Sequence, residues 1–253
     1  MSAHFEAEDL VCAYGQYPVL QLARLAVQAG KVTAIVGPNG AGKSTLIRAL
    51  AGQLLPASGT VRLQGVDLAR FTDRERARRI AYLPADSRLA WPLIARRVVE
   101  LGRFPYLKPL TQPGAADRDA VEAALAETDT AHLAERVFSE LSSGEKARIL
   151  LARAIATQAD ALLLDEPGAA LDPRHQLAVM EILRKEASRG SCVVFAGHSL
   201  DQVCRYADRV IVIRDGLVVA DGTPAEALTG DVLQTVFGLT APDGIAVQTW
   251  ETG

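Results

Sequence analysis

The hydrophobic pattern of the chain is dominated by uninterrupted apolar runs at residues 32–36, 80–83, 161–164 and 192–196. A strand that is covered on both faces loses the usual alternation of apolar and polar positions. Each run is followed by polar or glycine-rich residues and then by a helical pattern. This order predicts an α/β fold of three layers around a mainly parallel sheet, with functional residues at the carboxyl ends of the strands.

Other strands follow an alternating pattern, which is typical of antiparallel pairing. Residues 5–11 and 19–27 alternate on either side of a short turn, and residues 59–63 continue the pattern. We expect these segments to form a small antiparallel layer against the main sheet. Residues 210–213 and 217–220 predict a hairpin late in the chain.

Between these regions, residues 86–140 show no strand signal. Helical stretches at 94–101 and 116–127 are separated by prolines and a glycine, which interrupt helices. We interpret this segment as a helical subdomain inserted into one domain that spans the whole chain. The remaining residues, 1–85 and 141–253, are predicted to form the core of that domain.

Composition narrows the class of protein without identifying it. The 253 residues are 49% hydrophobic and 23% charged, with a net charge of −3. Disorder is excluded, and the slight acidity argues against nucleic acid as a partner. No apolar run reaches the roughly 18 residues that cross a bilayer, and the N-terminal residues predict no secretory signal. Cys12, Cys192 and Cys204 lack metal-site spacing and are expected to be reduced thiols; His4, His132 and His175 are expected at the surface.

Residues 37–44, GPNGAGKS, match the phosphate-loop pattern G-x-x-x-x-G-K-S/T in full. The loop follows a predicted strand and begins a predicted helix at 44–52, so backbone N–H groups and the helix dipole would face a phosphate. Lys43 would reach the β- and γ-phosphates, and the Ser44 hydroxyl would ligate Mg²⁺. The sequence therefore predicts ATP and Mg²⁺ as ligands. The expected phosphate-binding residues are Gly37, Asn39, Gly40, Gly42, Lys43, Ser44 and Thr45.

Asp165 and Glu166 end the apolar run at 161–164. An aspartate at the tip of a buried strand beside a phosphate loop is placed to hold Mg²⁺, by way of water. The next residue, Glu166, is placed to act as a general base on the attacking water.

A second pattern, LSSGE at residues 141–145, precedes a predicted helix at 146–157. It resembles the signature motif of ABC-type ATPases, usually LSGGQ. The resemblance covers nearly the whole chain. It implies that Tyr14 stacks on adenine, although a packed turn aromatic is the alternative. It also implies that residues 167–172 form the D-loop, and that His198 is the switch histidine that contacts the γ-phosphate.

One phosphate loop covers only one side of a γ-phosphate. In the ABC family, a second subunit presents its signature motif to the other side. The resemblance therefore implies a head-to-tail dimer around two ATP molecules, in which Ser142 and Gly144 act on the partner's nucleotide. The chain carries one copy of each motif, so it would pair with itself or with a close relative.

Residues 77–84, 89–92 and 98–106 are similar to the importer ATPases for ferric siderophores, haem and cobalamin. In that group, this region contacts a coupling helix of the membrane permease. The resemblance implies a peripheral subunit at the cytoplasmic face of the membrane, with permease partners and, indirectly, a solute-binding protein. Two alternatives stay open: a soluble ABC ATPase in an assembly role, such as iron–sulfur assembly, and a low-turnover regulatory subunit.

The sequence departs from the family pattern at three places. Ala85 replaces a glutamine that helps to hold Mg²⁺ and water in the family, and alanine has no hydrogen-bonding side chain; Asp86 is adjacent. The D-loop reads GAA at 168–170, where serine or threonine is common. In the signature, Ser143 replaces glycine and Glu145 replaces glutamine. These departures leave the expectation of ATP binding intact, and they raise the question of how ATP hydrolysis is coupled to transport.

Overall fold

The computed structural model describes residues 4–85, 92–108, 111–169 and 171–240. These residues form one ten-stranded sheet with the order β5-β4-β1-β2-β10-β9-β3-β8-β7-β6. Its strands are β1 (Phe5–Tyr14), β2 (Tyr17–Val27), β3 (Val32–Val36), β4 (Ser58–Leu63), β5 (Val66–Asp67), β6 (Ile80–Leu83), β7 (Ala161–Asp165), β8 (Cys192–Ala196), β9 (Arg209–Arg214) and β10 (Leu217–Gly222). The four predicted core strands are confirmed, and they pair in parallel.

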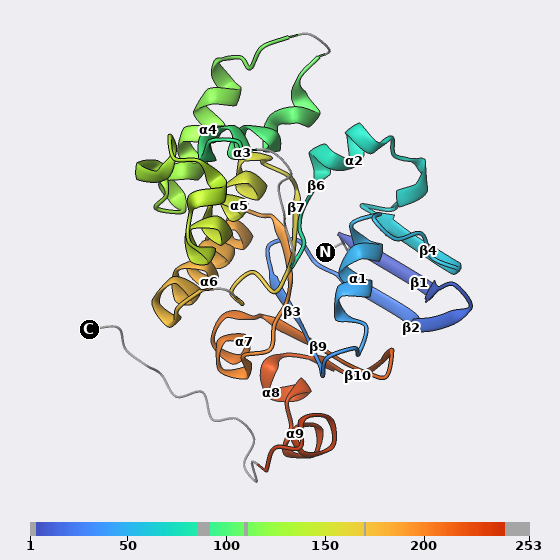
Figure 1. Cartoon of the computed structure of the whole chain (residues 1–253). Coiled ribbons are helices and arrows are strands. Elements are labelled where there is room, and N and C mark those ends of the chain that lie inside the picture. Colours follow the sequence, from blue (N-terminus) through green and yellow to red (C-terminus); the bar gives the residue numbers. More distant parts are fainter. Residues whose placement is uncertain (1–3, 86–91, 109–110, 170, 241–253) are drawn as a thin grey trace.

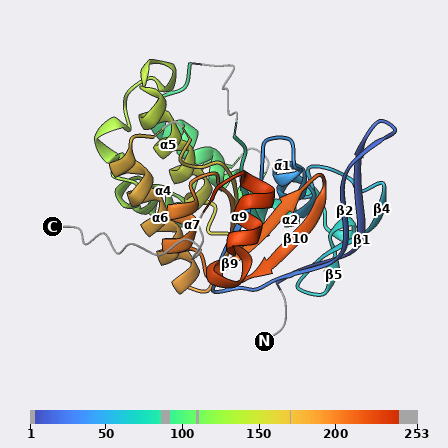
Figure 2. The same ribbon diagram turned by 90° about the horizontal axis from the view of Figure 1, so that it is seen from below.

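The helices are α1 (Lys43–Leu50), α2 (Asp73–Arg79), α3 (Ala95–Glu100), α4 (Ala115–Glu127), α5 (Ser143–Ala156), α6 (Pro173–Ser188), α7 (Leu200–Tyr206), α8 (Pro224–Ala227) and α9 (Gly230–Phe237). Single 3₁₀ turns are η1 (Leu68–Arg70), η3 (Ala131–Leu133) and η4 (Phe138–Glu140), and η2 (Leu101–Tyr106) is longer. Figures 1 and 2 show α4, α5 and α6 together at one side of the molecule and β1, β2 and β4 at the other.

Two hydrophobic cores lie on the two faces of the central sheet. Alternate residues of β3 belong to different cores: Val32 and Ala34 face the helices α3 to α6, whereas Ile35 faces α1. On the α1 side, Leu46 and Ile47 pack between the central strands and the N-terminal strands. This double burial explains why these strands are continuously apolar.

The N-terminal strands are antiparallel, as predicted, with Tyr14 opposite Tyr17 across the turn. They are not a separate layer, however. β2 is joined to β10 by one parallel bridge, Leu217 to Gln21, so the antiparallel strands continue the main sheet at its edge. The sequence pattern identifies strands but contains no local signal for this edge contact, since it joins residues far apart in the chain.

Two smaller expectations are wrong. The helix predicted at 146–157 begins at Ser143, because Ser142 accepts from the N–H of Glu145 and the Glu145 carboxylate accepts from the N–H of Ser142, a capping box. His4 is buried, with 5% of its surface exposed, rather than lying on the surface. The His4 N–H donates to the carbonyl oxygen of Val27, and the His4 carbonyl oxygen accepts from the N–H of Gln64. This backbone pairing places the ring beside that of Phe5.

Candidate functional site

The phosphate loop connects β3 to α1 as the sequence predicts. Gly37 must lack a side chain, because an added Cβ would lie 2.0 Å from the carbonyl oxygen of Ile213. Gly42 adopts φ +106° and begins α1 without a side-chain cap. The first-turn N–H groups of α1 are thus left for an anion, which is the physical basis of phosphate binding at a helix N-terminus.

The Lys43 side chain folds back into this loop. Its ammonium donates to the carbonyl oxygens of Gly37 at 2.9 Å and Pro38 at 3.1 Å, and the residue is only 6% exposed. Asn39 and Gly40 lie at the exposed tip of the loop, whereas Thr45 is buried in the first turn of the helix. The loop therefore concentrates one fixed positive charge and several N–H donors in a small volume.

Ser44 and Asp165 meet at the same end of the sheet. The Ser44 hydroxyl donates a 2.9 Å hydrogen bond to Oδ1 of Asp165, which is 2% exposed. Burial raises the pKa of Asp165, the Ser44 hydrogen bond opposes that rise, and the neighbouring Glu166 adds to it. These hard oxygen donors fit Mg²⁺. In the part of the chain that the structure describes, no group of three or more His, Cys, Asp or Glu residues could hold a metal, so phosphate and water would complete the shell.

Glu166 has a left-handed backbone with φ 52°, and its N–H donates to the carbonyl of Ala196 at 3.2 Å. For a residue with a side chain, this conformation is uncommon and must be held by its surroundings. Its carboxylate is half-buried at the end of β7. The strand end therefore places a second acid directly beside the predicted metal ligand.

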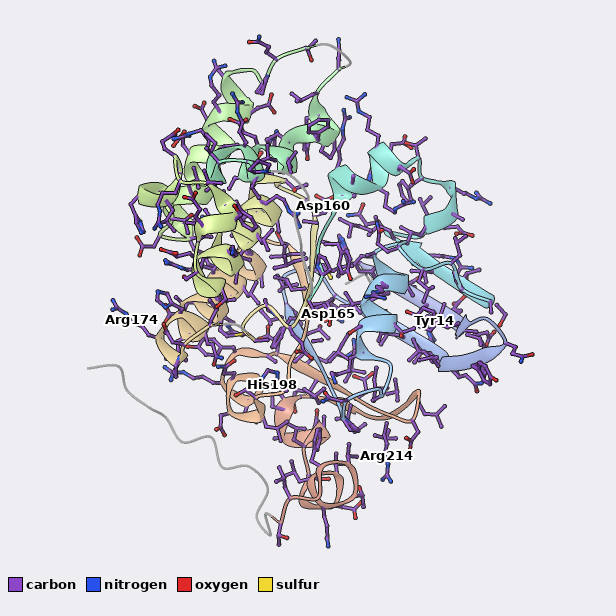
Figure 3. All side chains as sticks on the ribbon, viewed as in Figure 1. Tyr14, Asp160, Asp165, Arg174, His198 and Arg214 are labelled. Atoms are coloured by element: carbon purple, nitrogen blue, oxygen red, sulfur yellow. The ribbon has the colours of Figure 1, made fainter. Side chains whose placement is uncertain are left out.

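His198 and Tyr14 occupy opposite sides of this region. Figure 3 shows His198 and Asp165 near the same end of the sheet, with Asp160 at the other end of β7. His198 is exposed just after β8. Tyr14 lies beyond α1, 47% exposed, and its hydroxyl accepts a 3.4 Å hydrogen bond from Arg48. An exposed ring at this edge is accessible for stacking on a base.

Arg48 also lies at this site, although no sequence motif includes it. Hydroxyls of Tyr82 and Tyr14 beside its guanidinium raise the pKa of Arg48. It lies on α1 between the aromatic at the tip of β1 and the strand that leads to Ala85. A lysine or arginine in the last turn of a helix is the one local signal for it; its tyrosine neighbours come from distant segments.

Ser142 and Gly144 lie at the start of α5, remote from the phosphate loop in sequence. The Ser142 N–H donates to Glu145 Oε2 at 2.7 Å, and the Ser142 hydroxyl accepts from the Glu145 N–H at 3.3 Å. Hydrogen bonds from the backbone and the side chain of Ser142 to the Glu145 carboxylate lower the pKa of Glu145. The fixed negative charge of Glu145 thus stands at the helix N-terminus, where the family pattern has a neutral glutamine.

Ala85 is exposed directly after β6. Asp86, the residue that could compensate for its missing hydrogen bonds, lies outside the described residues, as does Ala170 of the predicted D-loop. Of that loop, Gly168 and Leu171 are both held by Gln176, whose Nε2 donates to their carbonyl oxygens at 3.1 Å each. No sequence motif draws attention to Gln176.

The chain is similar to known proteins over most of its length. The family model described as ABC transporter matches residues 20–169. A hemin import ATP-binding protein of Nocardia farcinica is 47% identical over 219 residues, which are 87% of this chain and 75% of that protein. A cobalamin import ATP-binding protein of Halobacterium salinarum is 41% identical over 221 residues, 87% of this chain and 55% of that protein. Among solved structures, a metal-chelate type ABC transporter in an inward-facing conformation matches with a TM-score of 0.81 and 28% identity, covering 94% of this chain and 90% of that one.

Proposed function

The chain belongs to the ABC transporter family as an ATP-binding, ATP-hydrolysing import subunit, and we propose that it powers uptake of haem, an iron siderophore or a cobalamin-type solute. The observation that carries this proposal is the meeting of Ser44 and Asp165 at 2.9 Å beside the Lys43 loop, in a chain whose relatives include hemin and cobalamin import subunits. The solute would cross through a separate permease.

Each residue at the site has a proposed role in hydrolysis. Lys43 and the N–H groups of the loop bind the β- and γ-phosphates, and Tyr14 stacks on adenine. Glu166 accepts a proton from water as the water oxygen bonds to the γ-phosphorus and the bond to the bridging oxygen breaks. His198 donates a hydrogen bond to the γ-phosphate. Mg²⁺, held by Ser44 and Asp165, would supply neutralisation of phosphate charge when bound.

A second subunit completes the site in this proposal. Ser142 and Gly144 would face the γ-phosphate bound by the partner, since one loop leaves half of that phosphate uncovered. The N-terminus of α5 suits this task because its dipole favours negative charge. The partner is a copy of this chain or a close relative.

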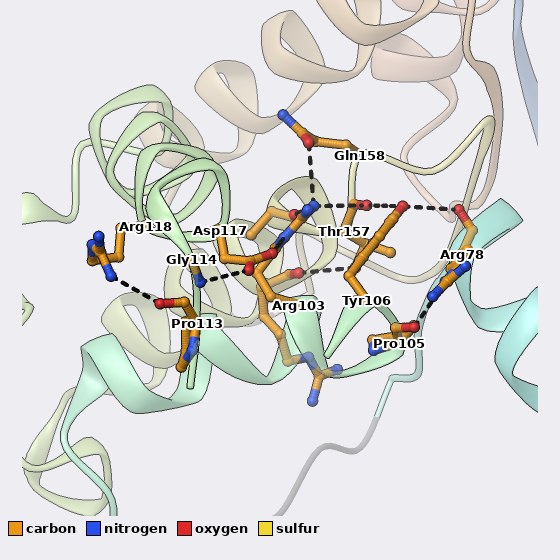
Figure 4. A network of polar contacts seen from close by, with 12 residues as sticks. Arg78, Arg103, Pro105, Tyr106, Pro113, Gly114, Asp117, Arg118, Thr157 and Gln158 are labelled. Atoms are coloured by element: carbon orange, nitrogen blue, oxygen red, sulfur yellow. Dashed lines mark hydrogen bonds and ion pairs between the residues drawn. The ribbon is translucent and has the colours of Figure 1, made fainter. Parts of the chain in front are cut away.

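The proposed permease contact is a groove of about 690 Å³ between α2 and β6 on one side and η2 and α5 on the other. Figure 4 shows the polar network that fixes its η2 wall. Arg103, 6% exposed, donates to Asp117 at 3.0 Å and to the carbonyl of Ala156 at 2.9 Å. Its guanidinium also lies 4.0 Å from the centre of the Tyr106 ring. These contacts tie η2 to α4 and α5, and the next residue of η2, Phe104, is 66% exposed.

Arg153 of α5 gives the groove a specific chemistry. It lines the groove, and burial lowers the pKa of its guanidinium. Among the described residues it has no ion pair and no side-chain hydrogen bond. Arg153 is only partly exposed at the wall of the groove, and a carboxylate or a helix C-terminus on the permease could pair with its charge there.

Co-expression with the permease of a haem, siderophore or cobalamin importer tests the proposal. We expect the two proteins to co-purify from membranes and, in proteoliposomes, to drive ATP-dependent uptake of haem, a ferric siderophore or cobalamin. Glu166→Gln should abolish uptake while leaving the complex intact. A chain that hydrolyses ATP but never associates with the permease would favour the assembly-type ATPase instead.

The docking groove has its own test. Arg153→Glu should release the chain from the permease, whereas Arg153→Lys should retain part of the binding. Arg24→Glu, on the exposed face of β2, is the matched charge-reversal control and should leave binding unchanged. Unaltered co-purification of Arg153→Glu protein that still binds ATP would exclude this groove.

A further inference from the structure

Gln176 holds the loop that follows the proposed general base. It lies half-buried near the start of α6, and both of its amide donors are used, on the carbonyls of Gly168 and Leu171. An added Cβ at Gly168 would be 3.4 Å from Cγ of Gln176, so the loop packs directly on this side chain. The left-handed backbone of Glu166 must be held by its surroundings. The two hydrogen bonds from Gln176 fix the backbone that follows Glu166, and they therefore help to fix the position of Glu166 itself.

The same side chain also contacts the helix behind His198. Gln202 of α7 donates through Nε2 to Oε1 of Gln176 at 2.7 Å. α7 spans only seven residues, and Ser199 precedes it without a side-chain cap. Such a short helix depends on lateral contacts for its position. Gln202 therefore ties the segment that follows His198 to the segment that follows Glu166.

The orientation of the Gln176 amide is fixed by its partners. Backbone carbonyls only accept, so the Gln176 nitrogen must face Gly168 and Leu171, and its oxygen is left for Gln202. Half-buried amides of this kind lose more when one partner is removed than an exposed pair would. All three polar contacts of the Gln176 amide are thereby assigned.

We propose that Gln176 and Gln202 are positioning residues that hold the loop behind Glu166 and the helix behind His198 as one unit, so that the two groups are placed together for hydrolysis. This inference rests on the proposed roles of Glu166 and His198. Neither glutamine touches nucleotide in this account. The pair acts through the backbone of Gly168 and Leu171 and through α7.

A double-mutant cycle tests the inference. Gln202→Ala should lower kcat about fivefold to tenfold, the effect of losing one half-buried hydrogen bond. Gln176→Ala loses three such bonds and should lower kcat by at least as much, and KM for ATP should change less than about twofold in both variants. The double variant should be no slower than Gln176→Ala, because Gln202 acts only through Gln176. Gln234→Ala, an exposed position on α9, is the control and should keep the wild-type kcat.

A conservative variant separates the two contacts. Gln176→Glu keeps an acceptor for Gln202 but faces two carbonyls with a carboxylate, so kcat should fall while Gln202→Ala still lowers it further. A double variant whose loss in kcat equals the product of the single losses, or a lower Tm with unchanged kcat, would overturn the inference. Failure of the proposed function is distinguishable, because it would show as Glu166→Gln protein with wild-type hydrolysis.

Discussion

The Ser44 hydroxyl and the Asp165 carboxylate are 2.9 Å apart although 121 residues separate them in the chain. The sheet order β3-β8-β7 brings them together, because β3 leads into the phosphate loop and β7 ends at Asp165. Parallel strands end at the same edge, so residues that follow different strands gather there.

Lys43→Ala should weaken ATP binding about 10- to 100-fold, since a charge-assisted contact with phosphate is lost. The buried ammonium also bonds Gly37 and Pro38, so the loop should lose order as well as charge. Isothermal titration calorimetry measures the affinity. The control is Lys146→Ala, which removes an exposed lysine hydrogen bond to the carbonyl oxygen of Ser139 on another helix. An unchanged ATP affinity for Lys43→Ala would contradict the assignment of residues 37–44 as a phosphate-binding loop.

Glu166→Gln should bind ATP normally and hydrolyse it about 10²- to 10⁴-fold more slowly, the usual effect of removing a positioned general base. The substitution keeps the size of the side chain. Phosphate release measures hydrolysis, and size-exclusion chromatography should detect an accumulated ATP-bound dimer. Hydrolysis at the wild-type rate would remove Glu166 from the mechanism.

Glu145→Gln should tighten ATP-induced dimerisation about fivefold, as expected when about 1 kcal/mol of charge repulsion with the partner's phosphates is removed. The glutamine oxygen can still accept from the Ser142 N–H, so the cap remains. Sedimentation in the Glu166→Gln background measures the dimer without turnover. Weaker dimerisation in the neutral variant would show that the negative charge supports the interface.

Ala85→Gln should lower the Mg²⁺ concentration for half-maximal hydrolysis about fivefold to tenfold, because glutamine restores an acceptor oxygen and an amide near the phosphates. Mg²⁺ titration of ATPase rates measures this. Asp86→Ala is the companion variant. No gain from Ala85→Gln together with a large loss from Asp86→Ala would indicate that the chain has already compensated.

Glu127→Gln should destabilise the fold by about 1–2 kcal/mol at pH 7. Burial raises the pKa of Glu127, but ion pairs with Lys185 at 2.8 Å and Arg189 at 3.1 Å outweigh it, so the pKa is lowered overall. A carboxyl group whose pKa is lowered in the folded state stabilises the fold at pH values above its unfolded pKa of about 4.5. This stabilisation disappears as the pH falls through the folded pKa.

Denaturant unfolding at several pH values measures that effect. The gap between wild type and Glu127→Gln should therefore be full at pH 7 and should close below about pH 4. Glu181→Gln, at an exposed position on α6, is the matched control with no expected gap. A gap that is constant with pH would attribute the loss to packing rather than to charge.

Much of the site is a local property of the sequence. The strand at 32–36, the glycines of residues 37–44 and the acidic pair after 161–164 are adjacent in the chain, and local sterics and burial fix their conformation. The same holds for the hairpin formed by β9 and β10, which the runs at 210–213 and 217–220 on either side of the turn at 214–216 predict. Such features need no knowledge of distant segments.

Tertiary structure alone decided the rest. His4 is buried because its backbone pairs with both Val27 and Gln64, and the N-terminal strands join the sheet through one bridge between β2 and β10. The pairing of Gln176 with Gln202 and the contacts of Arg103 likewise join segments that no local pattern relates. A polar side chain has the same local signal whether it is solvated or buried with a partner. Only the fold determines which partner removes its cost of burial.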